Sequence, residues 1–406
     1  MELESLPEGW EIRSLGEVAE IKAGNPAPQK EKYFENGNIP FVRVQDLGRY
    51  GKTSFLTEVK DKVNSVAITE CKLKIFPEGT VLLPKSGMST LLNHRAILAK
   101  NACVVSHLAA IIPQKNALSE YLYYFLCTLD SSRIAQRTTL PSIKLKTLSN
   151  LEIPLPPLEE QKKIVEILQF ADYLKERRRE AIKLIDKIVM SLFYDMFGDP
   201  ATNPKGWEVK KIGDIVKKTQ YGISKAMNTE KRGFPILRMD NITYDGHLDI
   251  ANLKYIEIDR KIAEKYLLNK GDILFNRTNS KELVGKTTTF NIDGEYVFAS
   301  YLIRLVPDRS IVVPEFISVF LNSRAGKKIL FDISRQAIGM ANINAQELCS
   351  INIPLPPLDL QQEFAEIVSK LEAKRKKMEE AEEKLEMLYQ ILLRQAFTGK
   401  LTEEWR

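Results

Sequence analysis

The side chains that most often carry metal or redox chemistry are few in this sequence and widely spaced. The four cysteines form no C-x-x-C pair: Cys71, Cys103, Cys127 and Cys349. The three histidines lack the spacing of metal ligands: His94, His107 and His247. We interpret the cysteines as buried free thiols and the histidines as structural side chains, and we predict no metal site and no cofactor.

Motifs that bind nucleotides or activate nucleophiles are also missing. Two Gly-Lys-Thr triplets, at residues 51–53 and 285–287, lack the first glycine of a phosphate-binding loop, because Asp46 and Ser280 stand in its place. We find no G-x-G-x-x-G before a helix, no G-x-S-x-G and no Asn/Asp-Pro-Pro-aromatic tetrad of amino-methyltransferases. The sequence therefore favours a binding protein over an enzyme, and it predicts no catalytic residue.

The net charge of +6 is concentrated in two segments of the chain. Residues 1–157 carry 19 Lys/Arg and 16 Asp/Glu, and residues 199–357 carry 23 and 18. The remaining segments, 158–198 and 358–406, have net charges of 0 and −2. A surface that faces phosphates would need this distribution.

The chain contains one unit twice. Residues 152–158, which include Ile-Pro-Leu-Pro-Pro-Leu, recur with one change 200 positions later, and Gln161 matches Gln361 at the same offset. Gln136 matches Gln336 and Phe197 matches Phe397, again 200 positions apart. Within the preceding part of each copy, matching residues keep their order, but the number of positions between them varies. This indicates a shared scaffold with altered loops.

Each copy begins with a globular segment, which we call head one (1–157) and head two (199–357). Short apolar runs bounded by Gly, Pro and Asn predict strands at residues 81–83, 103–105, 272–275 and 302–306. Helices are predicted near residues 118–129 and 314–321. We predict two similar, β-rich mixed α/β heads in an α+β protein. Trp10 and Trp207, at matching places, are predicted to pack in the cores.

A long helix follows each head: residues 158–198 are the first spacer helix, and residues 358–406 are the second spacer helix with a C-terminal tail. Glycine and proline vanish for about forty residues after each Pro-Pro pair, and apolar residues recur at heptad spacing. Gly198 and Gly399 are predicted to end the helices. Because the first helix leads into head two, the second can bury its apolar seam only by running back along it. This predicts an antiparallel two-helix coiled coil, roughly 60 Å long, with pseudo-two-fold symmetry that separates the heads.

The duplicated Leu-Pro-Pro-Leu-x-x-Gln before a long helix, and the Gln-Ala-Phe-Thr-Gly-Lys-Leu of residues 395–401, resemble the specificity subunits of Type I restriction-modification enzymes. The resemblance covers nearly the whole chain. The first copy departs from it at residues 197–200, Phe-Gly-Asp-Pro, where the Phe-x-Gly-Lys-Leu ending is absent.

The resemblance implies that each head is a target recognition domain that reads one half of a split double-stranded DNA sequence. It also implies that the helices set the spacing and dock two modification (methyltransferase) subunits, which bind S-adenosylmethionine and flip the target adenine. Restriction subunits, which translocate and cleave DNA, would join through them. Because the head loops differ, we predict two half-sites of different sequence.

The predicted DNA contacts are polar residues in loops at equivalent places in both heads. Arg and Lys can bind guanine O6/N7 or phosphate, and Asn can read adenine. The candidates of head one are Arg43, Lys85, Ser86, Ser89, Thr90, Gln136 and Arg137. Those of head two are Tyr221, Ser224, Lys225, Arg238, Arg277, Thr278, Asn279, Lys281, Arg335 and Gln336. For any single residue, a solvated loop is an equally good interpretation.

Two other functions remain open from the sequence. One is a coiled-coil scaffold whose heads grip protein partners without DNA specificity, and the other is an autonomous nuclease or methyltransferase, which the missing motifs disfavour. The absence of a long apolar run and of a secretion signal favours a cytoplasmic protein without a membrane partner.

Overall fold

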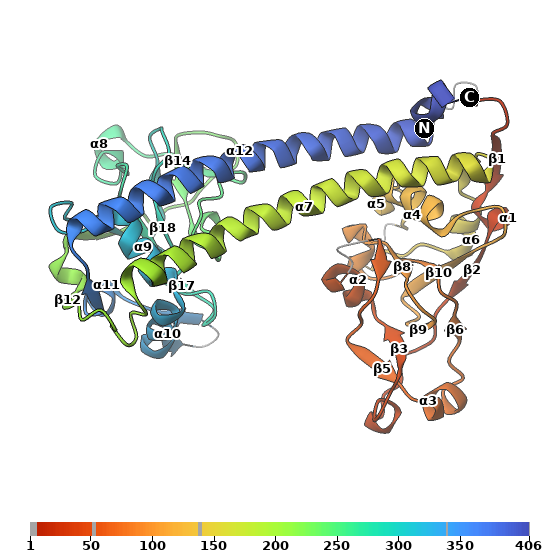
Figure 1. The fold of residues 1–406 in the computed structure, drawn as a ribbon, viewed down its shortest axis with the longest axis horizontal. Coiled ribbons are helices and arrows are strands. Elements are labelled where there is room, and N and C mark those ends of the chain that lie inside the picture. Colours follow the sequence, from red (N-terminus) through yellow and green to blue (C-terminus); the bar gives the residue numbers. More distant parts are fainter. Residues whose placement is uncertain (1–5, 51–53, 137–139, 338–339, 406) are drawn as a thin grey trace. The chain divides into compact units, whose positions relative to one another are not determined.

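The computed structural model describes residues 6–50, 54–136, 140–337 and 340–405. It contains two compact units, which are described separately (Figure 1). Unit 1 comprises Met1–Glu180 and Glu380–Arg406, and unit 2 comprises Ala181–Glu379. Each of the two long helices therefore contributes one part to each unit.

Unit 1 contains two mixed sheets and a two-stranded ribbon (Figure 1). The five-stranded sheet has the order β2 (Ala19–Ala23), β10 (Leu108–Pro113), β7 (Val81–Pro84), β8 (Ala96–Leu98), β4 (Phe55–Leu56). The four-stranded sheet has the order β5 (Asp61–Val63), β3 (Ile39–Val42), β9 (Ala102–Val104), β6 (Ile75–Phe76). The ribbon pairs β1 (Glu11–Ser14) with β11 (Glu152–Leu155).

Short helices connect these strands in unit 1. They are α1 (Leu15–Val18), η1 (Glu31–Tyr33), α2 (Val44–Tyr50), α3 (Ser65–Glu70), η2 (Met88–Leu92), α4 (Ser119–Cys127), α5 (Ser131–Ile134) and α6 (Leu145–Ser149). The α3 helix begins at Asn64, whose side-chain oxygen accepts a hydrogen bond from Ala67 N at 3.0 Å. The α4 helix is the main packing element, because Tyr121 and Phe125 are buried on it against Phe397.

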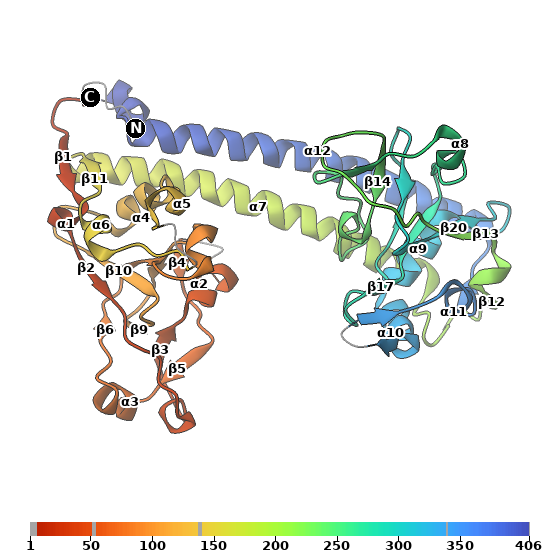
Figure 2. The ribbon, with the colours of Figure 1, turned by 180° about the vertical axis from the view of Figure 1, so that it is seen from behind.

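Unit 2 repeats the ribbon and the mixed strand pairing (Figure 2). Its four-stranded sheet has the order β13 (Val216–Tyr221), β20 (Leu302–Pro307), β16 (Ile273–Asn276), β18 (Thr287–Thr289). Two three-stranded sheets have the orders β15 (Lys254–Ile256), β14 (Phe234–Leu237), β19 (Val297–Phe298), and β17 (Thr278–Asn279), β22 (Met340–Asn342), β21 (Arg335–Ala337). The ribbon pairs β12 (Glu208–Lys211) with β23 (Asn352–Leu355). The short helices are η3 (Ile212–Asp214), η4 (Met239–Asn241), α8 (Arg260–Ala263), α9 (Pro314–Asn322), α10 (Arg324–Ile333) and α11 (Ala345–Cys349).

The strand registers confirm the internal repeat. Glu11 lies opposite Leu155 in the first ribbon, and Glu208 lies opposite Leu355 in the second. The parallel pairing of β3 with β9 returns as the parallel pairing of β14 with β19. The predicted strands correspond to β7, β9, β16 and β20, and the predicted short helices correspond to α4 and α9. Trp10 is buried as predicted, and Trp207 is half-buried, with its indole N–H donating to Phe197 O at 2.9 Å.

The long helices are α7 (Leu158–Phe197) and α12 (Leu358–Ala396). Each starts directly after Pro-Pro, and its fourth residue is a fully buried glutamine. Gln161 Oε1 accepts from Leu118 N at 2.9 Å, and its amide nitrogen donates to Asn116 O and Pro156 O at 2.9 Å each. Gln361 repeats this pattern with Val313 N, Ile311 O and Pro356 O. The duplicated glutamine thus ties each helix start to its own head.

The first helix ends where the sequence predicts, directly before Gly198, and the second ends at Ala396, three residues before Gly399. Gly198 and Gly399 have φ of 80° and 75°, a left-handed conformation that glycine adopts without strain after the last helical turn. Within the described residues, no helix is both long and apolar enough to cross a membrane.

In unit 1 the beginning of α7 packs antiparallel to the end of α12. Lys175 Nζ lies 2.8 Å from Glu386 Oε2, and Arg179 Nε lies 2.8 Å from Glu382 Oε1, so the numbers rise on one helix as they fall on the other. Tyr389 donates to Asp172 Oδ2 at 3.3 Å. Burial raises the pKa of the Asp172 carboxyl, although Lys175 and two tyrosine hydroxyls favour its ionised form.

In unit 2 the end of α7 packs on the beginning of α12 through aromatic rings. Phe364 lies with its ring centroid 5.9 Å from that of Phe193 and 5.1 Å from that of Phe197, both edge to face. His247 of head two joins both helices, because its Nε2 is 2.7 Å from Asp186 Oδ1 and its Nδ1 is 3.6 Å from Glu372 Oε1.

The contacts of the long helices follow the predicted heptad seam only in part. The seam residues Ile164, Ile185 and Phe364 are buried, but Leu174, Ile188 and Leu388 are exposed. Lys175, outside the predicted seam, is only 9% exposed. The seam prediction is wrong at these positions because burial follows the cores shared with the heads. Ile164 and Phe364 belong to such cores, and Leu174, Ile188 and Leu388 do not.

The tail of the chain meets the start of head one within unit 1. Trp10 Nε1 donates to Glu160 Oε2 at 3.0 Å, and the Thr402 hydroxyl donates to the other carboxylate oxygen. Leu6 and Leu401 both pack against the same core. Residues 401–402 therefore approach the start of head one through Glu160 and this shared core.

Candidate nucleic-acid interface

In head one, two predicted contact segments lie together beyond the end of β7. Lys85 N donates to His107 O at 2.9 Å, and Ser86 Oγ lies 2.7 Å from His107 Nδ1. Ser142 forms β-bridges with both Ser86 and Gln136, and Gln136 N donates to Ser142 O at 2.8 Å. The residues at positions 85–90 and Gln136, 46 or more positions apart, thus form one polar surface.

A hollow of about 450 Å³ extends this surface towards Arg43. It is lined by Arg43, Val44, Gln45, Gly48, Ser89, Leu92, His94, Val105 and His107. The Arg43 guanidinium pairs with Asp61 and lies 5.5 Å from the Phe41 ring centroid, which fixes its orientation. Arg43, Ser86 and Ser89 are therefore grouped around His107.

In head two, the equivalent segments form a small sheet of their own. The central strand β22 pairs with β17 on one side and β21 on the other. This places Thr278 and Asn279 beside the Met340–Asn342 strand, which in turn pairs with the backbone of Arg335 and Gln336. The two predicted groups of head two therefore converge as those of head one do.

Arg277 is the most constrained cation of this surface. Its Nη2 donates to Asn342 Oδ1 at 3.2 Å, and its guanidinium carbon lies 4.8 Å from the Tyr221 ring centroid. Lys281 lies nearby in sequence, with its ammonium 4.1 Å from the ring of Phe331 on α10, which adjoins β17 (Figure 2). The structure thus joins Tyr221 to Arg277, which the sequence did not predict.

Arg238 belongs to the segment that corresponds to Arg43. Its guanidinium pairs with Asp240 at 3.1 Å, and its side chain is 18% exposed. Lys286 holds this segment by donating to Met239 O and Ile242 O, and burial lowers the pKa of its ammonium. Ser224 and Lys225 are exposed, and Lys225 Nζ donates to Glu257 O at 2.7 Å, beyond the end of β15. This contact does not join Lys225 to the residues around Arg277.

Two predicted contacts need correction, and others lie outside what the structure describes. Thr90 and Thr278 are only 0% and 8% exposed, because η2 and β17 turn them inward, so we drop them as direct contacts. Arg137 lies outside the described residues, and for Arg335 and Gln336 only the backbone is described. The positions of their side chains therefore stay predictions.

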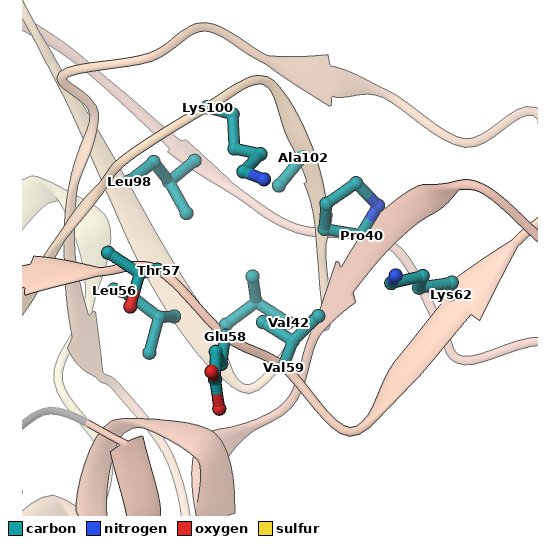
Figure 3. Close-up of a pocket in the computed structure, with 10 residues that line it drawn as sticks. All are labelled: Pro40, Val42, Leu56, Thr57, Glu58, Val59, Lys62, Leu98, Lys100 and Ala102. Atoms are coloured by element: carbon teal, nitrogen blue, oxygen red, sulfur yellow. The ribbon is translucent and has the colours of Figure 1, made fainter.

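A second hollow in head one contains none of the predicted residues. It measures about 490 Å³ and is lined by Pro40, Val42, Leu56, Thr57, Glu58, Val59, Lys62, Leu98, Lys100 and Ala102. Figure 3 shows the amines of Lys100 and Lys62 on either side of Pro40, with the Glu58 carboxylate directed away from them. Six of the ten lining residues have apolar side chains, and Lys62 and Lys100 add to the basic charge of head one.

Sequence reasoning missed two residues of the interface, His107 and Asn342. Ser106 matches Ser300 in the repeat, so the next residue, His107, corresponds to Tyr301. Asn342 lies 200 positions after Ser142, at the offset that also relates Gln161 to Gln361. Because Ser142 is not among the predicted contacts of head one, this offset does not by itself point to Asn342.

The surface offers hydrogen-bond donors and charge, and its chemistry is that of binding. Within the described ranges, no three His, Cys, Asp or Glu side chains gather as metal ligands would. The four cysteines are free thiols, and burial raises the pKa of both Cys103 and Cys127 to about 11. These thiols are protonated at neutral pH and are poor nucleophiles.

The comparison with known families decides between the open interpretations. The model of the Type I restriction modification DNA specificity domain matches twice, at residues 7–184 and 204–387. The chain belongs to this family. The two matches follow the internal repeat, and they support the DNA-reading interpretation over the protein-interaction scaffold.

Related proteins extend over the whole chain. The specificity subunit of the Type I restriction enzyme EcoKI from Escherichia coli K12 is 25% identical over 435 residues, covering 99% of this chain and 91% of the relative. The MjaIX specificity subunit from Methanocaldococcus jannaschii is 33% identical over 232 residues, which is 52% of each chain. This chain thus aligns with about half the length of the MjaIX subunit.

Two solved structures share the fold. One, from work on complex assembly and conformational transition of the type I R-M system, has a TM-score of 0.57 at 20% identity and covers 98% of this chain and 100% of its own. The other, an S subunit of a Type I restriction-modification system from M. genitalium, has a TM-score of 0.53 at 15% identity and 98% coverage of each chain.

Proposed function

We propose that this chain is the DNA-reading subunit of a Type I restriction-modification complex, with no catalysis of its own. Head one (1–157) and head two (199–357) act as target recognition domains, and each reads one half of a bipartite duplex. The observation that carries this proposal is the double match to the specificity-domain family, with a polar, cation-bearing surface at equivalent strand ends in both heads.

The long helices, at residues 158–198 and 358–406, form an antiparallel, pseudo-two-fold spacer of coiled-coil type in this proposal. Antiparallel contacts in unit 1 and aromatic packing in unit 2 support it. Two modification subunits dock on these helices, and restriction subunits join through them. The complex acts in the cytoplasm, where its partners supply the methyl transfer and the cleavage.

Replacing Lys85 by alanine tests the contact surface. Lys85 directly follows β7 and lies beside the Leu108 end of the neighbouring strand β10. Its replacement therefore removes a cation from the proposed interface. With the assembled complex, we expect weaker binding to the cognate duplex and a salt dependence of log K that is shallower by about 1. Filter binding or anisotropy at several salt concentrations measures both quantities.

Lys115→Ala is the matched control. Lys115 is exposed and follows the opposite end of β10, a strand of six residues or roughly 20 Å. It should leave affinity and salt dependence unchanged. Equal effects of the two variants, or equal binding of the unmodified complex to all duplexes, would contradict the proposed interface.

A further inference from the structure

The backbone of Arg277 is fixed on both sides in head two. Its N–H donates to Tyr301 O at 3.0 Å, and its carbonyl accepts from Ile343 N at 2.9 Å. These bonds anchor the residue between β16 and β17, next to the central strand β22. Lys85 of head one makes the equivalent pair of bonds, with His107 O and Ile143 N, so in both heads the fold sets the direction in which this side chain leaves the backbone.

The ring of Tyr221 lies against the guanidinium of Arg277. The Tyr221 hydroxyl accepts from Ala345 N at 2.9 Å, and its ring is 4.8 Å from the Arg277 guanidinium carbon. The next residue is Gly222, whose backbone lies close to the chain at Phe298 and Ala299. A Cβ at position 222 would lie 2.3 Å from the carbonyl oxygens of both residues, so only glycine fits there. The ring is therefore held at the end of β13 while 42% of Tyr221 stays exposed.

Asn342 completes the clamp from the other side. It lies in β22, paired with Thr278 and with the backbone of Arg335, and its Oδ1 accepts from Arg277 Nη2 at 3.2 Å. A stacked ring and one hydrogen bond restrict rotation of the guanidinium, which lowers the entropy lost when a ligand binds.

The clamp leaves one edge of the guanidinium for a ligand. Nε is buried without a hydrogen-bond partner, and Nη1 makes no hydrogen bond with the residues that the structure describes. Nη1 therefore keeps two hydrogens and Nη2 keeps one, so two donor nitrogens remain for a ligand. Guanine presents two acceptors, O6 and N7, in the major groove, and arginine is their usual bidentate partner.

We propose that Asn342 and Tyr221 are positioning residues that aim Arg277 at a guanine in the half-site read by head two. This inference rests on the proposed function. In head one, the counterparts of Arg277, Tyr221 and Asn342 are Lys85, Ala23 and Ser142. These residues provide no guanidinium, no aromatic ring and no side-chain amide. The two heads therefore differ at this position in what they can discriminate.

The test selects bound duplexes from a randomised library with the assembled complex. The unmodified complex should require guanine at one position of one half-site. Asn342→Ala and Arg277→Lys should each reduce the preference for guanine at that position by about tenfold, with the other half-site and the affinity for unrelated DNA unchanged. Asn342→Asp, which keeps an oxygen acceptor for Nη2, should retain the preference.

Asn291→Ala is the control, because Asn291 is exposed in the same head and its side chain donates to Glu315 Oε1 at 3.4 Å, away from Arg277. An unaltered preference in Asn342→Ala would overturn the inference while the proposed function stands. An equal loss of affinity for every duplex in Arg277→Lys would also overturn it, since that result identifies a phosphate contact. No sequence preference in the unmodified complex would overturn the proposed function itself.

Discussion

Replacing Phe364 by alanine should destabilise unit 2 by about 3–5 kcal/mol. Phe364 is fully buried on α12, and its ring meets the edges or faces of Phe193 and Phe197 on α7. Truncation removes these contacts and leaves a cavity between two helices that are also packed on the head. The effect is large because the ring is fully buried in the core that both long helices share with head two.

Chemical denaturation followed by Trp207 fluorescence measures this loss, in a chain whose Trp10 and Trp405 are replaced by phenylalanine. Trp207 reports on unit 2 because its indole donates to Phe197 O. Phe364→Ile, which introduces the residue found at position 164 of the first copy, should cost less. Phe170→Ala, at a site 62% exposed, should change stability by at most ~0.5 kcal/mol. Similar losses in Phe364→Ala and Phe170→Ala would contradict the described packing.

Replacing Gln161 by leucine should destabilise unit 1 by about 3 kcal/mol or more. Its side chain serves three backbone groups, and each group left buried and unpaired costs about 1–3 kcal/mol. Leucine fills a similar volume, so the loss reports on hydrogen bonds more than on a cavity. Denaturation followed by Trp10 fluorescence, with Trp207 and Trp405 replaced, measures it.

Gln169→Leu is the matched control, because Gln169 is exposed on the same helix. We expect a change within ~0.5 kcal/mol there. If Gln161→Leu were as mild as this control, the buried glutamine would not be what fixes the start of α7, and the physical explanation of the duplicated motif would fail.

The repeat, the helix boundaries and many strands could be predicted because they depend on local signals. Pro-Pro pairs set the helix starts, glycines such as Gly198 set the ends, and apolar runs between turn residues become strands such as β7 and β16. The offset of 200 also singled out Gln161 and Gln361 before their hydrogen bonds were known. Local patterns do not state what these glutamines bind.

The composition of the interface depends on strand order, which the sequence does not display. Arg277 and Asn342 are 65 positions apart and meet only because β22 lies between β17 and β21. The inward turn of Thr90 and Thr278 follows from η2 and β17, elements too short to predict. The heptad rule failed at Leu174 and Leu388 because neither residue belongs to a core shared with a head, where buried positions such as Ile164 lie.

The central claim is that each head reads its own half of one DNA target. The most direct measurement is selection from a randomised duplex library by the complex assembled from the unmodified chain, repeated with Lys85→Ala and with Arg277→Ala. We predict two specific segments separated by an unconstrained spacer, with Arg277→Ala relaxing one segment and leaving the other intact, and with Lys85→Ala lowering the affinity while both segments stay specific. One contiguous segment, or relaxation of both segments by Arg277→Ala, would contradict the account.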